Sequence, residues 1–261
     1  MKRDCEILKE ASIYVRKWIE KQPSVKEESL TDWLLYDISE KAKRIIYRSF
    51  TRNEEAKTTG ADWEWWFLYG KFSYKFRVQA KKINVSGDNY PSIGYANRHG
   101  LQIEKLIEDS NRNNFLPIYA FYTDKVDKVR CGKNILDEGV YISGANGLNE
   151  KIIKQSRKVI VYNDILEDSI PLSCMLCCPI SDRSSDEGFS KFISTYFGTE
   201  MSSLGKELGR YSEIPRYIIS LLETTQNNLP DWWEKEFFRY VENVNGILVF
   251  DYRDVDTTIT E

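Results

Sequence analysis

The chain has 261 residues, of which 41% are hydrophobic and 30% charged, and its formal net charge is −3. This composition suits a soluble globular protein and excludes one that coats DNA with an evenly basic surface. The single histidine, His99, excludes a histidine-rich zinc site, and no apolar run approaches the roughly 18–20 residues that span a bilayer. The polar first residues lack the apolar region of a signal peptide, so we expect a cytoplasmic protein with no membrane partner.

Apolar residues at helical spacing predict a helix over residues 4–21 and a second one from about Ser24 to about Arg48. Ser24-Val-Lys-Glu27 fits a capping box at the start of the second helix. Glu28 lies in the first turn of that helix. It either contributes an acid to a functional site or only interacts favourably with the positive helix N-terminus, and the sequence leaves both readings open.

Residues 58–82 predict two β-strands joined by a tight turn at Gly70-Lys71. Apolar and polar residues alternate along the second strand, which is typical of a strand with one buried and one exposed face. Glycine at the first central position suits a two-residue type II′ loop. We therefore expect a short antiparallel hairpin.

Pairing of Tyr69 with Phe72 across that turn would set Asp62 opposite Gln79, with Lys81 diagonally placed on the same face. A carboxylate, a carboxamide oxygen and an ammonium gathered in this way predict a site for magnesium and phosphate. The alternative is an amphipathic hairpin whose charges form exposed ion pairs, which contribute only ~0–1 kcal/mol and need no function.

Beyond the hairpin, the pattern predicts a helix over about 97–109 and a buried strand over 116–122. Further predicted segments are strands at 159–162 and 247–252, helices at 151–158, 214–224 and 232–244, and loops at 143–147 and 181–188. The order of elements predicts an α/β (α+β) fold with a mixed central sheet flanked by helices. The loop at 181–188 would separate a domain at 1–180 from a mainly helical extension at 181–261, unless 1–261 is a single domain.

Three short strings, Glu54-Glu55, Gly60-Ala61-Asp62 and Gln79-Ala80-Lys81, resemble the signature of the restriction-endonuclease-like, or PD-(D/E)xK, nuclease superfamily. The Gln-x-Lys form resembles its Mrr-like branch, and the whole string is similar to a bacterial family of that superfamily. The resemblance covers about residues 24–122 and implies an α-β-β-β-α-β core. The sequence departs from the acidic pattern at Gln79, whose neutral oxygen would hold a cation more weakly than a glutamate would.

The resemblance implies a magnesium- or manganese-dependent endonuclease that hydrolyses phosphodiester bonds of DNA in bacterial defence, with RNA as the alternative substrate. The residues that it implies for catalysis are Asp62, Gln79, Lys81, Glu55 and Glu28. The cation would be held by Asp62, the Gln79 side chain, the Ala80 carbonyl and Glu55, which is only slightly preferred over Glu54.

Residues 71–82 contain five basic residues and no acid, and from this stripe Lys75 and Arg77 are expected to guide the nucleic-acid backbone. Gln102 matches a polar position that the resembled family carries near the site, or it is an ordinary surface glutamine. Trp63 and Trp65 are expected to point into the core, whereas Trp66 shares the Asp62 face.

Two other functions remain open on the sequence: a catalytically weak sensor of nucleic acid or nucleotides, and an assembly subunit of a defence system. Cleavage of both strands of a duplex would favour a homodimer.

The five unevenly spaced cysteines argue against a disulfide framework. Cys174, Cys177 and Cys178 are expected to be buried thiols in an apolar strand rather than a zinc site.

Overall fold

The computed structural model describes residues 2–49, 60–70, 72–91, 93–94, 96–97, 100–126, 137–155, 160–177, 186–202, 214–223, 233 and 244–254. The α-helices are α1 (Lys2–Lys21), α2 (Glu27–Lys41), α3 (Gln102–Asn113), α4 (Ala145–Gln155), α5 (Tyr162–Leu166), α6 (Asp186–Ser202) and α7 (Arg216–Glu223). A 3₁₀ helix, η1, spans Leu172–Met175. None of the described helices combines the length and apolar character needed to cross a bilayer.

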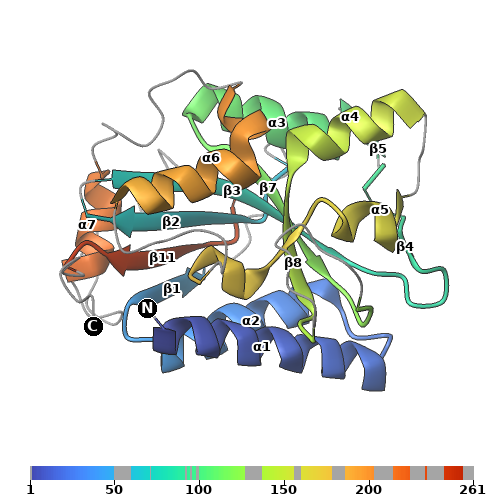
Figure 1. The fold of residues 1–261 in the computed structure, drawn as a ribbon, viewed down its shortest axis with the longest axis horizontal. Coiled ribbons are helices and arrows are strands. Elements are labelled where there is room, and N and C mark those ends of the chain that lie inside the picture. Colours follow the sequence, from blue (N-terminus) through green and yellow to red (C-terminus); the bar gives the residue numbers. More distant parts are fainter. Residues whose placement is uncertain are drawn as a thin grey trace.

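The main sheet is built from β1 (Ile45–Ser49), β2 (Trp63–Tyr69), β3 (Phe72–Lys82), β7 (Leu116–Tyr122), β8 (Val140–Gly144), β10 (Ile170–Pro171) and β11 (Gly246–Tyr252). Two-stranded sheets pair β4 (Asn89–Tyr90) with β9 (Ile160–Val161), and β5 (Ala96–Asn97) with β6 (Gly100–Leu101). Within the described residues the main sheet has seven strands in the order β1-β11-β2-β3-β7-β8-β10. Figure 1 shows α1 and α2 side by side along one side of it, and α3 and α4 on the opposite side. The predicted mixed sheet flanked by helices is confirmed.

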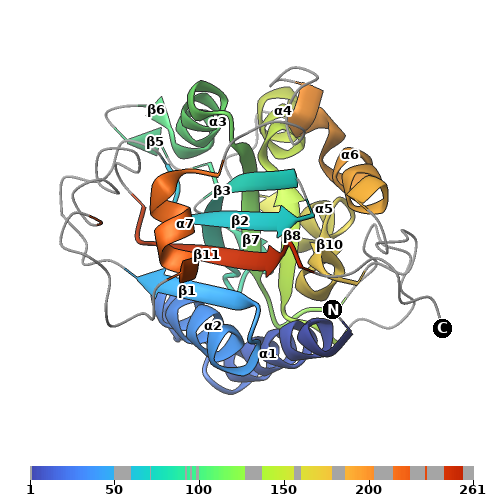
Figure 2. The same cartoon turned by 90° about the vertical axis from the view of Figure 1, so that its left-hand side faces the viewer.

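The strand nearest the C-terminus, β11, lies inside the sheet, between β1 and β2 (Figure 2). It runs antiparallel to β1 and parallel to β2. The final strand predicted at 247–252 is therefore confirmed. Strand β1 therefore joins the sheet only by pairing with β11, which itself pairs with β2 of the hairpin.

The second helix is shorter than its apolar spacing suggests. It ends at Lys41, and Ile45–Ser49 forms strand β1 instead of a further helical turn, because the β-branched and aromatic residues there pair with β11. The predicted capping box is also wrong: the residue before the helix is Lys26, and it makes no side-chain capping bond. Glu27 is thus the first helical residue, and its carboxylate can form contacts outside the helix.

The polar face of β3 is buried, which corrects the prediction of a half-buried strand. Arg77, Gln79 and Lys81 are 1%, 2% and 6% exposed. The alternation correctly marks a strand, but it does not reveal that α3 covers its polar side. Neither edge of β3 is exposed, because it lies between β2 and β7, and contacts from Asp109 and Gln102 of α3 cover its polar face.

Other boundaries shift by a few residues. The predicted helix at 97–109 begins at Gln102, and the predicted loop at 143–147 is the end of β8 followed directly by α4. The strand at 116–122 and the helix near 214–224 are confirmed as β7 and α7. The helix predicted at 232–244 and the boundary loop at 181–188 lie mostly outside the described residues.

The cysteines differ from expectation. Residues 172–175 form η1 rather than a strand, and Cys177 just beyond it is disulfide-bonded to Cys5 of α1. Cys174 is a buried thiol, as predicted. The bonded pair joins residues 172 positions apart, a pairing that cysteine spacing alone could not reveal.

Candidate functional site

The hairpin has the predicted register. Tyr69 pairs with Phe72, and every pair from there to Trp63 and Val78 follows the same alignment. Gly70 has a φ of +52°, the left-handed value that the first central residue of a primed two-residue turn requires. Local turn chemistry thus determines which residues of the two strands meet.

Asp62 lies immediately before the first residue of β2, and its side chain faces β3. Its backbone nitrogen donates to Val78 O at 2.8 Å, and its carboxylate oxygen Oδ2 accepts from Ala80 N at 3.0 Å. The same oxygen accepts a hydrogen bond from Gln79 Nε2. The carboxylate therefore continues the hydrogen bonding of the ladder, and the expected meeting of Asp62 with Gln79 is confirmed.

Gly60 explains how the chain reaches this position. Its φ is +72°, and a Cβ there would lie 2.7 Å from Gln102 O and 3.0 Å from Leu106 N. The backbone therefore passes directly against the first turn of α3. Only glycine fits this approach without strain, and the approach brings Asp62 close to α3.

The amide of Gln79 is oriented in the opposite sense to the one expected. Its nitrogen donates to Asp62 and, at 3.1 Å, to Ala80 O, whereas its oxygen Oε1 accepts from Gln102 Nε2 at 2.8 Å. The two oxygens predicted to bind a cation, Gln79 Oε1 and Ala80 O, each accept an amide hydrogen here. Rotation of the Gln79 amide would be needed to present its oxygen beside Asp62.

Glu27 is a site residue that the sequence reasoning missed. It is the first residue of α2, and its Oε2 accepts a 2.6 Å hydrogen bond from Lys82 N. Burial raises its pKa to about 7; the positive charge of Lys81 opposes this rise, and the negative charge of Asp62 adds to it. In the sequence, Glu27 was assigned only to a capping box that does not form. Its position next to Glu28 was the one hint that it could belong to the site.

Lys81 and Glu28 belong to the same region. Lys81 is buried, and its charge acts on the Glu27 carboxylate. Glu28 is exposed and lines the same pocket as Glu27 and Asp62. The structure thus groups the predicted Asp62, Gln79 and Lys81 with acids from the first turn of α2.

A buried tyrosine faces this group. Tyr119 of β7 is in register with Gln79, and its hydroxyl has no hydrogen-bond partner within the described part of the chain. Burial raises its pKa, and the charges of Asp62 and Glu27 raise it further. A hydroxyl left without a partner this close to two carboxylates is a polar group that a bound ligand or water could satisfy.

Arg77 is not available to a nucleic-acid backbone, which corrects one predicted contact. Its Nη1 lies 3.0 Å from Glu64 Oε2, and its Nε lies 3.2 Å from Asp109 Oδ2 on α3. With 1% of its surface exposed, it is a structural cation that joins β2, β3 and α3. Lys75 is less enclosed: its Nζ donates to Asn113 O at 3.2 Å, and its expected substrate contact stays a prediction.

The tryptophans of β2 are buried. Trp66, which shares the Asp62 face in the predicted hairpin, packs in the core with 1% of its surface exposed and donates to buried Glu64. Trp63, expected to point only into the core, lines the pocket beside Asp62. Trp65 is buried as expected.

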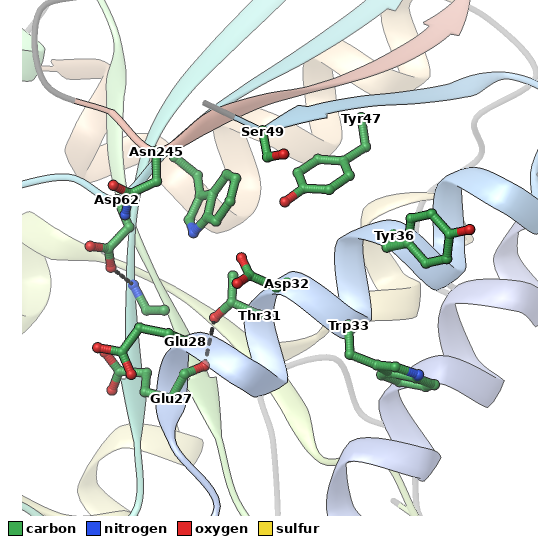
Figure 3. A pocket seen from close by; sticks show the side chains of 12 residues that line it. Glu27, Glu28, Thr31, Asp32, Trp33, Tyr36, Tyr47, Ser49, Asp62 and Asn245 are labelled. Atoms are coloured by element: carbon green, nitrogen blue, oxygen red, sulfur yellow. Dashed lines mark hydrogen bonds between the residues drawn. The ribbon is translucent and has the colours of Figure 1, made fainter. Parts of the chain in front are cut away.

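The pocket has a volume of about 700 Å³ and is lined by both acidic and aromatic side chains. Figure 3 shows Asp62, Glu27 and Glu28 at one end, and Tyr36 and Tyr47 at the other, with Asp32 between them. Among the described residues, no three Asp, Glu, His or Cys side chains are grouped so that they could hold a metal ion. Glu54, Glu55 and His99, considered from the sequence, lie outside the described residues.

Comparison with known proteins adds a family and no activity. A search of curated proteins finds no match to the chain. Residues 4–256 match a family described as "Family of unknown function (DUF6615)", a span that includes the hairpin, the pocket and strand β11. The chain therefore belongs to the DUF6615 family.

Proposed function

We propose that this protein is a magnesium-dependent nuclease that hydrolyses phosphodiester bonds of DNA, with RNA as the alternative substrate, in the cytoplasmic defence of a bacterium against foreign DNA. The observation that carries the proposal is the contact of the Asp62 carboxylate with the Gln79-Ala80-Lys81 strand. This contact joins the Gly-Ala-Asp and Gln-Ala-Lys strings on which the resemblance to restriction-endonuclease-like nucleases rests.

The available donors suit a hard cation. Asp62 supplies a carboxylate oxygen, and the Ala80 carbonyl and a rotated Gln79 amide supply neutral ones. Magnesium prefers oxygen ligands and is commonly held by one or two protein carboxylates, with water completing its shell. A cation bound there would polarise the phosphate and lower the pKa of bound water.

The side chains themselves divide the remaining tasks. The ammonium of Lys81 would offset the negative charge that develops on the phosphate. Glu27, whose pKa is raised to about 7, would accept the proton of the attacking water near neutral pH. The new P–O bond would form as the bond to the leaving sugar oxygen breaks. Asp62 would orient the phosphate through the cation.

The decisive experiment incubates purified protein with supercoiled plasmid in Mg²⁺ or Mn²⁺, and in EDTA. We expect nicking or linearisation that EDTA, Asp62→Asn and Lys81→Met each abolish. Two matched controls should cleave normally: Lys82→Met, on the neighbouring position of β3, and Asp37→Asn, at a half-buried acid of α2 that is ion-paired with Lys41. Equal activity in wild type and Asp62→Asn would refute the assignment.

A second candidate function, a nucleic-acid sensor, is favoured by one observation. The amide of Gln79 replaces an acid beside Asp62, and the described residues lack a three-acid metal group. A sensor would bind labelled DNA in EDTA and leave the plasmid intact under all metal conditions. Light scattering on the same samples would report whether DNA assembles the chain into the dimer expected for double-strand cleavage.

A further inference from the structure

One wall of the pocket beside Asp62 is the indole of Trp63, which is almost fully buried, with 4% of its surface exposed. Trp63 follows Asp62 directly, and its six-membered ring lies over Gly246 of β11, where a Cβ would overlap ring atoms Cζ3 and Cε3. In the ladder Gly246 is the direct neighbour of Trp63. The absence of a side chain at Gly246 therefore lets the indole lie across the neighbouring strand.

A second ring and several polar groups line the same space. Tyr47 of β1 has its ring centroid 5.6 Å from that of Trp63, at an interplanar angle of 48°. Asn245 and Ser49 also line the pocket, and Asn245 N donates to Asp62 O at 2.6 Å. A volume of about 700 Å³ is in the range of sites for small organic ligands, which combine apolar walls with a few polar groups.

The aromatic surface continues outside the pocket along α1 and α2. Trp33 lines the pocket and is stacked by Tyr14, with centroids 4.2 Å apart. Tyr14 and Tyr36 are 50% and 58% exposed, and they are the aromatic members of the exposed large hydrophobic side chains that the structure describes. Exposed rings of this kind that adjoin a pocket mark an interaction surface for flat, apolar groups.

We propose that this pocket binds an unpaired base of a single-stranded nucleic acid, with the partly exposed rings of Trp33 and Tyr36 on α2 as the stacking surface and the buried indole of Trp63 as the wall behind it. The inference rests on the proposed function, because the adjoining Asp62 site would bind the phosphate of the same nucleotide. A base inside the pocket cannot remain paired in a duplex. The preferred substrate is therefore a single strand, or a nucleotide displaced from its helix.

The test measures binding rather than cleavage. Asp62→Asn protein in Mg²⁺ is titrated with three fluorescent 12-nucleotide probes: a single strand, the same strand with abasic sites at its central positions, and its duplex. We expect the base-bearing single strand to bind about tenfold more tightly than the other two. The abasic strand retains every phosphate, so it separates base stacking from charge.

Variants assign the effect to the pocket. Tyr36→Ala and Trp33→Leu remove rings from the surface. Both should reduce single-strand affinity about five- to tenfold while leaving abasic-strand affinity unchanged. Val161→Ala, an exposed apolar position on β9 that does not line the pocket, is the control and should bind like the parent.

The outcomes separate this inference from the proposed function. Equal affinity for base-bearing and abasic strands would overturn the base pocket, even if the wild type cleaves plasmid. Base-dependent binding that Tyr36→Ala and Trp33→Leu weaken would support the pocket, even if no cleavage is found. A preference for duplex over single strand would also overturn it.

Discussion

The side-chain nitrogen of Gln102 donates a 2.8 Å hydrogen bond to the side-chain oxygen of Gln79, so that this oxygen faces α3 and the Gln79 nitrogen faces Asp62. A carboxamide presents an oxygen to a cation only when its nitrogen points elsewhere. The orientation of Gln102 thus decides which atom of Gln79 lies beside Asp62. Gln102 is a positioning residue in this arrangement.

Gln102→Glu is expected to strengthen Mg²⁺ binding. A carboxylate only accepts hydrogen bonds, so Gln79 would turn its nitrogen toward α3 and its oxygen toward Asp62. We expect about tenfold tighter binding by calorimetry, and weaker binding in Gln102→Leu. Asn111→Asp adds the same charge to α3 without the contact to Gln79 and should change the affinity little. Equal affinities in the Glu and Leu variants would rule out the positioning role.

Glu27 should make stability depend on pH. Its pKa is raised by burial from 4.5 to about 7, so the folded state holds this proton more strongly than the unfolded state. The stability from this group is fully present below pH about 4.5 and is lost as the pH rises through about 7. Urea unfolding between pH 5 and 8 should show this loss.

Glu27→Gln provides the comparison, because its side-chain oxygen can still accept from Lys82 N but does not titrate. The free energy of unfolding should fall less between pH 5 and 8 in this variant than in the wild type. Glu20→Gln, at an acid on α1 that is ion-paired with Arg16, should keep the wild-type profile. A Glu27→Gln profile as steep as that of the wild type would contradict the assignment.

The buried ion pair of Arg77 and Glu64 should be essential for stability. Their 3.0 Å contact is almost completely enclosed, and Glu64 also accepts from Tyr217 of α7 at 2.7 Å. Arg77→Leu leaves a buried carboxylate without its cation, and we expect a loss of about 3–5 kcal/mol in urea unfolding. Adding Glu64→Leu should recover part of that loss.

The exposed pair Lys41–Asp37 supplies the contrast on α2. Lys41→Leu should change the free energy of unfolding by no more than about 1 kcal/mol. If both variants lost a similar amount of free energy of unfolding, burial would not be the reason for the large contribution of Arg77 to stability.

Gly60→Ala tests the approach of the hairpin to α3. The φ of +72° and the predicted 2.7 Å clash with Gln102 O should cost about 1–3 kcal/mol and move Asp62 away from α3. Thermal unfolding and Mg²⁺ titration should both show a loss. Gly147→Ala in α4 is the control: nothing lies within 4 Å of its added Cβ, and a helical Ala should stabilise by about 0.5–1 kcal/mol.

The sequence was sufficient for features that depend on neighbours along the chain. The period of two and the two-residue turn at Gly70 determine that Asp62 meets Gln79, because a slip of one residue would turn every side chain to the other face. The strands at 116–122 and 247–252 follow in the same way from continuous apolar runs. These interactions are local, so their pattern is visible in the order of residues.

Only the tertiary structure decided which residues complete the site. Glu27 rather than Glu28 reaches β3 because α2 begins at residue 27 and docks against Lys82. Arg77 is unavailable because α3 covers it, and Trp63 lines a pocket because β11, far away in sequence, inserts a glycine beside it. Each outcome depends on packing between distant segments, and neither periodicity nor motif spacing contains that information.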